Sequence, residues 1–196
     1  MKVFSLMFLI TASAQAGIYK LDPAHSQVGF SVKHLMVSNV KGDFKKFDGK
    51  FNYDSAKKEV KDIDVTIETD SVETGVADRD NHLKGNDFFD AKKYPKMIFK
   101  SQKAELAPEG KVTKIKGMLT MRDKTLPVVL DVTNNGEVEF MGVKKVGFSA
   151  STKVNRKDWG LAWNKALDKG GVAVSDEVTI SIEGEANLDD GKPAKK

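Results

Sequence analysis

The chain has 196 residues, no cysteine, and a formal net charge of +4 from 32 Lys and Arg against 28 Asp and Glu. Without cysteine, neither disulfides nor a lipid anchor on a cysteine can form, so the fold depends on a hydrophobic core. The charges alternate in sign and no basic block exceeds a pair, which argues against nucleic acid as a partner.

The N-terminus reads as a signal peptide of residues 1–16. Lys2 precedes an apolar run over residues 3–10, and Ala14-Gln15-Ala16 fits the small-residue cleavage rule. The run is far shorter than the ~20 residues of a membrane span, so we expect no stable membrane insertion and a periplasmic location, or alternatively secretion. One domain is expected over residues 17–188, followed by a disordered tail over 189–196.

Alternation of apolar and polar residues dominates after Gly17 and predicts strands with one buried face. The clearest series lie within residues 28–34, 62–68 and 178–183. Further strands are expected at residues 40–47, 50–53, 96–106, 112–121, 126–132 and 145–154.

The turn signals favour antiparallel pairing of neighbouring strands. Asp48-Gly49 and Asn135-Gly136 are dipeptides that tight hairpins prefer, and residues 108–110 and 122–124 suit longer turns. About eight long strands, without a cluster of amphipathic helices to cover a flat sheet, predict an all-β, eight-stranded antiparallel barrel. A β-sandwich is the alternative.

Two segments interrupt the strand pattern. Residues 75–84 predict a short helix, with Thr74 as its cap and Gly85 as its stop, anchored to the barrel by Val76 and Leu83. Residues 157–175 predict a long loop with at most one turn of helix. Its Trp159 and Trp163 suit either a structural clamp or a lid over a ligand.

Histidines are few, at positions 25, 34 and 82, and none belongs to a close metal-binding pair. Zinc sites usually contain such a pair, so no metal is expected. His34 continues an inward-facing alternation and Arg156 continues another, so each side chain is expected to be buried with a partner or to contact a ligand. An unpaired buried guanidinium is costly; the expected partners of Arg156 are Asp22, Asp80 and Asp158.

Arg79, Asp80, His82 and Leu83 bring a cation, a carboxylate and an imidazole into one short segment. The segment suits either a functional cluster or the solvated face of a helix. No nucleophile elbow, phosphate loop or dinucleotide fingerprint is present, so we expect no enzymatic activity.

Several motifs, in this order and spacing, resemble those of the YceI family of periplasmic proteins with a lipocalin-like barrel. They are Asp22-Pro23-Ala24-His25-Ser26, Phe30-Ser31-Val32-Lys33-His34-Leu35, Gly42-Asp43-Phe44, Ser71-Val72-Glu73-Thr74-Gly75, Arg79-Asp80-Asn81-His82-Leu83, Asp87-Phe88-Phe89-Asp90, Tyr94-Pro95 and Asn155-Arg156-Lys157-Asp158 with Gly160. One departure is the turn Met121-Arg122-Asp123-Lys124-Thr125, where the family often has Gly-x-Thr.

The resemblance implies an extended barrel with a helix beside it and a long pore that binds a polyisoprenoid, a quinone or another long-chain amphiphile, without a further cofactor. It leaves the oligomeric state open, a dimer included. The residues expected to contact the ligand are Phe30, Val32, His34, Arg79, His82, Phe99, Phe148, Arg156 and Trp159, with Asp22, Asp80 and Asp158 as structural partners. The alternatives are a lipid-modifying enzyme and a stress-related structural factor whose barrel is filled by its own side chains.

Overall fold

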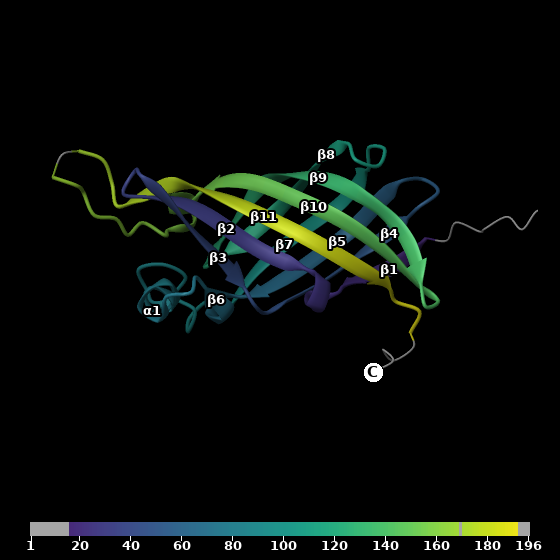
Figure 1. Cartoon of the computed structure of the whole chain (residues 1–196), viewed down its shortest axis with the longest axis horizontal. Helices are drawn as coiled ribbons and strands as arrows, with labels where there is room; N and C mark the ends of the chain where they lie inside the picture. Colours follow the sequence, from purple (N-terminus) through teal and green to yellow (C-terminus); the bar gives the residue numbers. More distant parts are fainter. Residues whose placement is uncertain (1–15, 169, 192–196) are drawn as a thin grey trace, which may run out of the picture.

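Eight antiparallel strands close into a ring in the computed structural model, which describes residues 16–168 and 170–191. Pairing of β1 with β11 closes the ring, and the barrel is elongated (Figure 1). Most of the predicted signal peptide and the end of the predicted tail lie outside the described residues. The ring strands are β1 (Gly17–Leu21), β4 (Phe47–Asp54), β5 (Glu59–Glu68), β7 (Lys96–Glu105), β8 (Val112–Met121), β9 (Lys124–Phe140), β10 (Val143–Asn155) and β11 (Val174–Leu188).

Three further strands extend the sheet beyond β11 at one end of the barrel. β2 (Gln27–His34) pairs with β11 and with β3 (Ser38–Phe44), and β3 pairs with β6 (Val72–Glu73). The helix α1 (Ala77–Lys84) follows β6 and lies at this end, together with the β2–β3 turn and the loop before β11 (Figure 1). Short 3-10 helices span Pro23–His25, Thr69–Ser71 and Arg156–Trp159 (η1, η2 and η3).

The alternation read from the sequence places one face of each strand inside the barrel. On β10, Val146, Ala150 and Val154 are buried, while the residues between them are more exposed. The large aromatic side chain of Phe148 lies opposite a glycine on the neighbouring strand. A Cβ on Gly184 would lie 2.3 Å from the ring of its cross-strand partner Phe148, so the barrel admits that ring only opposite glycine.

Two of the predicted hairpin turns are wrong. Asp48-Gly49 lies inside β4, and Asn135-Gly136 lies inside β9, whose turn to β10 comes instead at residues 141–142. Gly136 has a φ of 105° and pairs with Gly147 next to a register shift. Glycine is therefore required here by an irregularity in the pairing of two long strands, and not by a turn.

The predicted short helix is confirmed, two residues shorter at its N-terminus. The N-cap position is Val76 rather than Thr74. The Val76 side chain makes no capping hydrogen bond and is 48% exposed. The carboxylate of Asp80 instead accepts hydrogen bonds from the backbone N–H and the hydroxyl of Thr74. The predicted anchoring role of Val76 is wrong, because Leu83 packs against the core and Val76 does not.

The long segment after β10 has the predicted form, with one turn of helix (η3) and then a loop whose main regular feature is a bridge between Ala166 and Val172. Asp189, the first residue of the predicted tail, bonds the backbone of Ile18 and pairs with Lys20 at 2.9 Å. Within residues 16–168 and 170–191, no helix has the length and apolar composition needed to cross a membrane.

Candidate ligand-binding site

A cavity of about 580 Å³ runs along the inside of the barrel. On β10 its lining extends from Val146 to Val154 and continues to Arg156 in η3, which corresponds to roughly 33 Å of extended chain. On β11 it extends from Val174 to Ile182. The cavity is therefore long and narrow, and it fits an elongated ligand better than a compact one.

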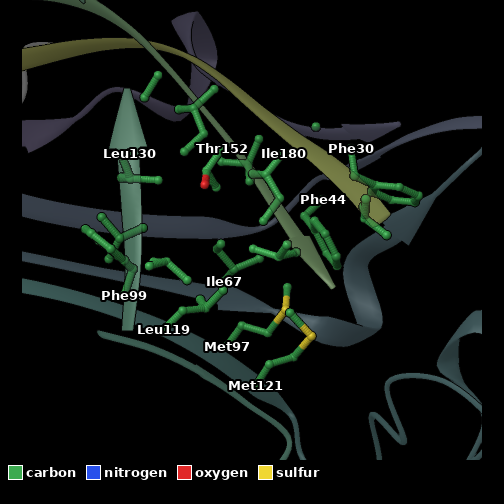
Figure 2. A pocket seen from close by; sticks show the side chains of 18 of the residues that line it. Phe30, Phe44, Ile67, Met97, Phe99, Leu119, Met121, Leu130, Thr152 and Ile180 are labelled. Atoms are coloured by element: carbon green, nitrogen blue, oxygen red, sulfur yellow. The ribbon is translucent and has the colours of Figure 1, made fainter. Parts of the chain in front are cut away.

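The wall is almost entirely apolar. Side chains from strands on opposite sides of the barrel converge on the space, as Figure 2 shows for Phe30, Ile67, Leu119 and Ile180. Among the side chains labelled there, Thr152 alone carries oxygen. Such a lining can exclude water and contact hydrocarbon, but it offers few hydrogen bonds along its length.

At one end of the cavity the lining includes the buried residues Tyr53 and Asn134. The hydroxyl of Tyr53 donates to a carboxylate oxygen of Glu137 at 2.6 Å, and Lys58 donates to the same oxygen at 3.3 Å. Burial, and then the bond to Glu137, raise the pKa of Tyr53. Asn134, 4% exposed, lines the cavity here and accepts a hydrogen bond from the N–H of Gly136. We call this the inner end.

The other end opens beside α1, because exposed residues of that helix, Asp78 and His82, belong to the lining. We call this opening the mouth. His82 Nε2 lies 3.0 Å from a carboxylate oxygen of Asp87. Arg79 donates through Nε to the hydroxyl of Thr74 at 2.7 Å and through Nη2 to its carbonyl at 3.0 Å. The side chains of Arg79 and His82 are therefore both held by partners within their own segment.

Arg156 lines the cavity but is fixed by structural contacts. Its guanidinium donates to the carbonyl oxygens of Leu161, Val174 and Ser175, and its charge is balanced by Asp176, 3.7 Å away. Burial lowers its pKa and Asp176 partly offsets that effect; a guanidinium remains charged in any case. The predicted ion pair exists, but its predicted partners were wrong.

Those three carboxylates lie elsewhere. Asp22 accepts hydrogen bonds from His25 at 2.9 Å and from the N–H of Ala24, and Asp80 bonds Thr74. Asp158 is exposed, and its carbonyl oxygen accepts from Lys124. Although burial alone would raise the pKa of Asp22, the hydrogen bonds it accepts lower it. Asp176 was missed because it lies twenty residues along the chain, beyond a loop whose path the sequence does not reveal.

The histidines are not gathered around one point. Among the described residues, the one group with metal-ligand spacing joins His25 to Asp22 and Glu185, whose ligand atoms lie within 4.8 Å of one another. Lys145 Nζ lies 2.5 Å from Glu185, so a cation already occupies that position.

The two tryptophans have different places. Trp159, predicted to contact the ligand, is 3% exposed and lies outside the lining; its indole N–H donates to the carbonyl of Leu119 at 3.1 Å. That prediction is wrong, because η3 turns the ring into the packed core. Trp163 lines the mouth instead, with ring centroids 5.0 Å from His82 and 5.5 Å from Phe88.

The remaining expected contacts all belong to the lining: Phe30, Val32, His34, Arg79, His82, Phe99 and Phe148. Phe88 and Phe89 are both buried, and both line the cavity. The sequence interpretation missed Met97, Met121 and Leu130. Strand parity could have found them, since each shares an inward face with apolar neighbours two residues away.

The unusual turn between β8 and β9 contacts η3. Arg122 donates to the carbonyl of Gly160 at 2.8 Å, and Lys124 donates to that of Asp158 at the same distance. The residues of this unusual turn therefore connect the β8–β9 hairpin to the segment that leads to the mouth.

Comparison with known proteins agrees with this geometry. The family model described as the YceI-like domain matches residues 19–186. The chain belongs to that family. A UPF0312 protein of Pseudomonas putida is 38% identical over 193 residues, covering 93% of this chain and 96% of its own. Protein YceI of Salmonella agona is 36% identical over 184 residues, covering 92% and 93%.

Solved structures show the same fold. The YceI protein of Campylobacter jejuni matches with a TM-score of 0.70 and 35% identity over 97% of this chain and all of its own. A polyisoprenoid-binding domain from Saccharophagus degradans matches with a TM-score of 0.62 over 89% and 99%. At 14% identity, the latter similarity shows the fold alone.

Proposed function

We propose that the chain binds one long-chain, predominantly apolar ligand of the polyisoprenoid class in its cavity, and that it carries or stores this ligand in the periplasm. The observation that supports this most directly is the cavity itself, which is continuous, apolar and much longer than it is wide. The named polyisoprenoid-binding domain shares the fold, so this architecture is compatible with such a ligand.

Energetics favour an occupied cavity. An apolar void of this size would cost on the order of 10 kcal/mol if it stayed empty, which is comparable to the whole stability of a typical domain. Each methylene group transferred from water contributes about 0.8 kcal/mol. A structural factor with a barrel filled by its own side chains does not fit the open space found here.

The mouth favours a neutral head group over a phosphate. Arg156 lies 3.7 Å from the carboxylate of Asp176, and the imidazole of His82 is already hydrogen-bonded to Asp87. Two N–H groups of Arg79 donate hydrogen bonds to Thr74, and Asp78 adds a negative charge to the lining. An anionic head group would have to displace these partners, whereas a quinone carbonyl needs only a hydrogen-bond donor. We therefore propose a quinone-like ligand rather than a polyprenyl phosphate.

A lipid-modifying enzyme is less well supported. Such an enzyme could use the neighbouring Asp80 and His82 as an acid–base pair, but His82 is bonded to Asp87 and Asp80 to Thr74. General acid–base catalysis needs its partners within hydrogen-bond reach of each other or of the substrate.

The test is solvent extraction of protein purified from the periplasm, followed by mass spectrometry. We expect the extract to contain a long-chain isoprenoid with a neutral head group, at about one molecule per protein molecule. Delipidated protein should then bind a long-tailed quinone more tightly than a polyprenyl phosphate of equal chain length. Protein that is empty as isolated and binds neither compound would refute the proposal.

A further inference from the structure

The turn between β2 and β3 exposes three consecutive apolar side chains at the mouth end. Leu35 is 40% exposed, Met36 51% and Val37 82%. We call residues 35–37 the mouth turn. His34, directly before it, lines the cavity, and the N–H of Leu35 bonds the carbonyl of Ala173 in the loop before β11 at 2.9 Å. The apolar tip and the cavity opening therefore belong to one end of the barrel (Figure 1).

The backbone of the mouth turn makes these residue types unexpected. Leu35 has a φ of 49° and Met36 a φ of 63°, the left-handed region that branched and bulky side chains enter at a cost. Hairpin turns of this geometry prefer Asn-Gly. An apolar pair at these positions therefore lowers the stability of the turn, and its exposure to water lowers solubility. Strain combined with exposure points to a contact outside the chain.

Positive charge surrounds the mouth turn. Lys33 and Lys41 flank it on β2 and β3, and the carbonyl of Lys165 bonds the N–H of Ala173. All three lysines are exposed, and none forms an ion pair within the described part of the chain. Apolar side chains framed by unpaired lysines match the surface of a bilayer that contains anionic lipid.

We propose that the mouth turn inserts into the interface of a phospholipid bilayer, so that the cavity opens onto the membrane rather than onto water. The benefit of such docking rests on the proposed function, because a long apolar ligand could then pass between bilayer and cavity without crossing water. The docking itself does not require a loaded cavity.

A second apolar tip supplies a matched control. In the β9–β10 turn, Phe140 is 61% exposed and Met141 87%, and Met141 also has a positive φ, 51°. This turn lies at the opposite end of the barrel (Figure 1). Glu137 and Glu139 precede it and Lys144 and Lys145 follow it. Lys144 lies opposite Glu139, and Lys145 pairs with Glu185, so the lysines beside this turn are matched by acidic residues. If exposed apolar area alone governed membrane contact, this tip would bind at least as well as the mouth turn.

The first experiment uses the absence of cysteine from the chain. Val37→Cys and Met141→Cys each allow a polarity-sensitive dye to be attached at a single site. On addition of phosphatidylglycerol–phosphatidylcholine vesicles, we expect a blue-shifted, brighter emission at position 37 and no change at position 141. Equal shifts at both positions, or a shift at 141 alone, would overturn the proposal.

The second experiment removes the apolar tip while improving the turn. The double variant L35N/M36G should fold at least as well as the wild type, because Asn and Gly suit positive φ. It should nevertheless lose about tenfold or more of its partitioning onto phosphatidylglycerol-containing vesicles in a flotation assay. The control variant M141N should retain wild-type partitioning.

Vesicles of phosphatidylcholine alone should bind the wild type more weakly, and added salt should weaken binding further. Wild-type protein that stays off all vesicles, or L35N/M36G that binds like the wild type, would refute membrane docking. Extraction and mass spectrometry on the same preparations keep the two proposals apart, since an empty protein that still docks would refute only the proposed ligand.

Discussion

The imidazole of His82 meets the indole of Trp163 edge to face, with ring centroids 5.0 Å apart. This contact joins α1 to the loop that follows η3, two segments separated by eighty residues of chain. Phe88 completes the cluster, 5.0 Å from His82. The three rings border the cavity at its mouth, so this cluster is where a ligand entering the barrel is expected to meet aromatic surface first.

Replacing Trp163 with Ala should weaken ligand retention more than it weakens folding. The ring is only half-buried without ligand, and losing its contacts should cost ~1–2 kcal/mol of binding, about tenfold in affinity. Binding of a fluorescent long-chain analogue and urea unfolding would measure the two effects.

Trp159→Phe is the matched control for that variant and should behave in the opposite way. The variant loses the bond to the carbonyl of Leu119 and leaves a small void in the core. It should lower the free energy of unfolding by about 1–3 kcal/mol with little effect on the affinity of delipidated protein for the analogue. Equal effects of the two tryptophan variants on binding would contradict the separate roles assigned to them.

Thr152→Phe should shorten the usable cavity. Thr152 points into the space near the C-terminal end of β10, about midway between the lining residues Val146 and Arg156 (Figure 2). An added ring would therefore occupy volume that the ligand needs rather than overpack a filled core. We expect less extracted ligand, or shorter chains, as measured by mass spectrometry. Thr152→Val keeps the shape, and it should load like the wild type; impaired loading there would assign the effect to the hydroxyl instead.

Arg156→Ala should destabilise the fold. It would remove the guanidinium that donates to the carbonyl oxygens of Leu161, Val174 and Ser175. Asn164 still donates to the Val174 carbonyl, and Asp176 keeps its ion pair with Lys157 at 2.9 Å. Because buried acceptors left without a donor cost about 1–3 kcal/mol each, we expect a loss of about 3–5 kcal/mol in urea unfolding. Arg156→Lys should rescue little, because a single ammonium group cannot reproduce the guanidinium fork.

Asp176→Asn removes the negative charge that faces Arg156 at 3.7 Å, together with the ion pair of Asp176 with Lys157 at 2.9 Å. Since the Asp176 side chain is 42% exposed, we expect a loss of at most about 1 kcal/mol. A stable Arg156→Ala protein with impaired loading would show instead that the guanidinium serves the ligand.

Alkaline pH should destabilise the inner end. The pKa of Tyr53 is raised in the folded state by burial and by its bond to Glu137, and that of Tyr19 is raised mainly by burial. A group whose folded pKa lies above its unfolded value stabilises the fold fully below the unfolded pKa, about 10 for tyrosine, and loses that contribution as pH rises above it. Melting temperatures between pH 8 and 11 should therefore fall above about pH 10.

Tyr53→Phe should flatten this alkaline decline, because it removes a tyrosine whose pKa is raised in the folded state. The variant should also be less stable at neutral pH, since Glu137 loses a hydrogen bond. A decline unchanged from the wild type would mean that other groups govern alkaline unfolding.

Local patterns predicted the elements better than the connections. The limits of β8 match the predicted range, and the helix and the turn of helix after β10 appear where expected. Asn135-Gly136 failed as a turn because the register of a long strand pair overrides the preference of a dipeptide. Trp159 failed as a ligand contact because the direction of its ring depends on the path of η3.

The sequence by itself determined that this chain forms strands with one apolar face and that it resembles YceI-like proteins, because those properties follow from local alternation and from motifs in fixed order. Closure into a barrel rather than a sandwich was decided by the pairing of β1 with β11. The tertiary structure decided which charged side chains already have partners, which tryptophan lines the cavity, and which end of the cavity opens beside α1. Those outcomes depend on residues such as Arg156 and Asp176, or His82 and Trp163, that meet only after the chain has closed.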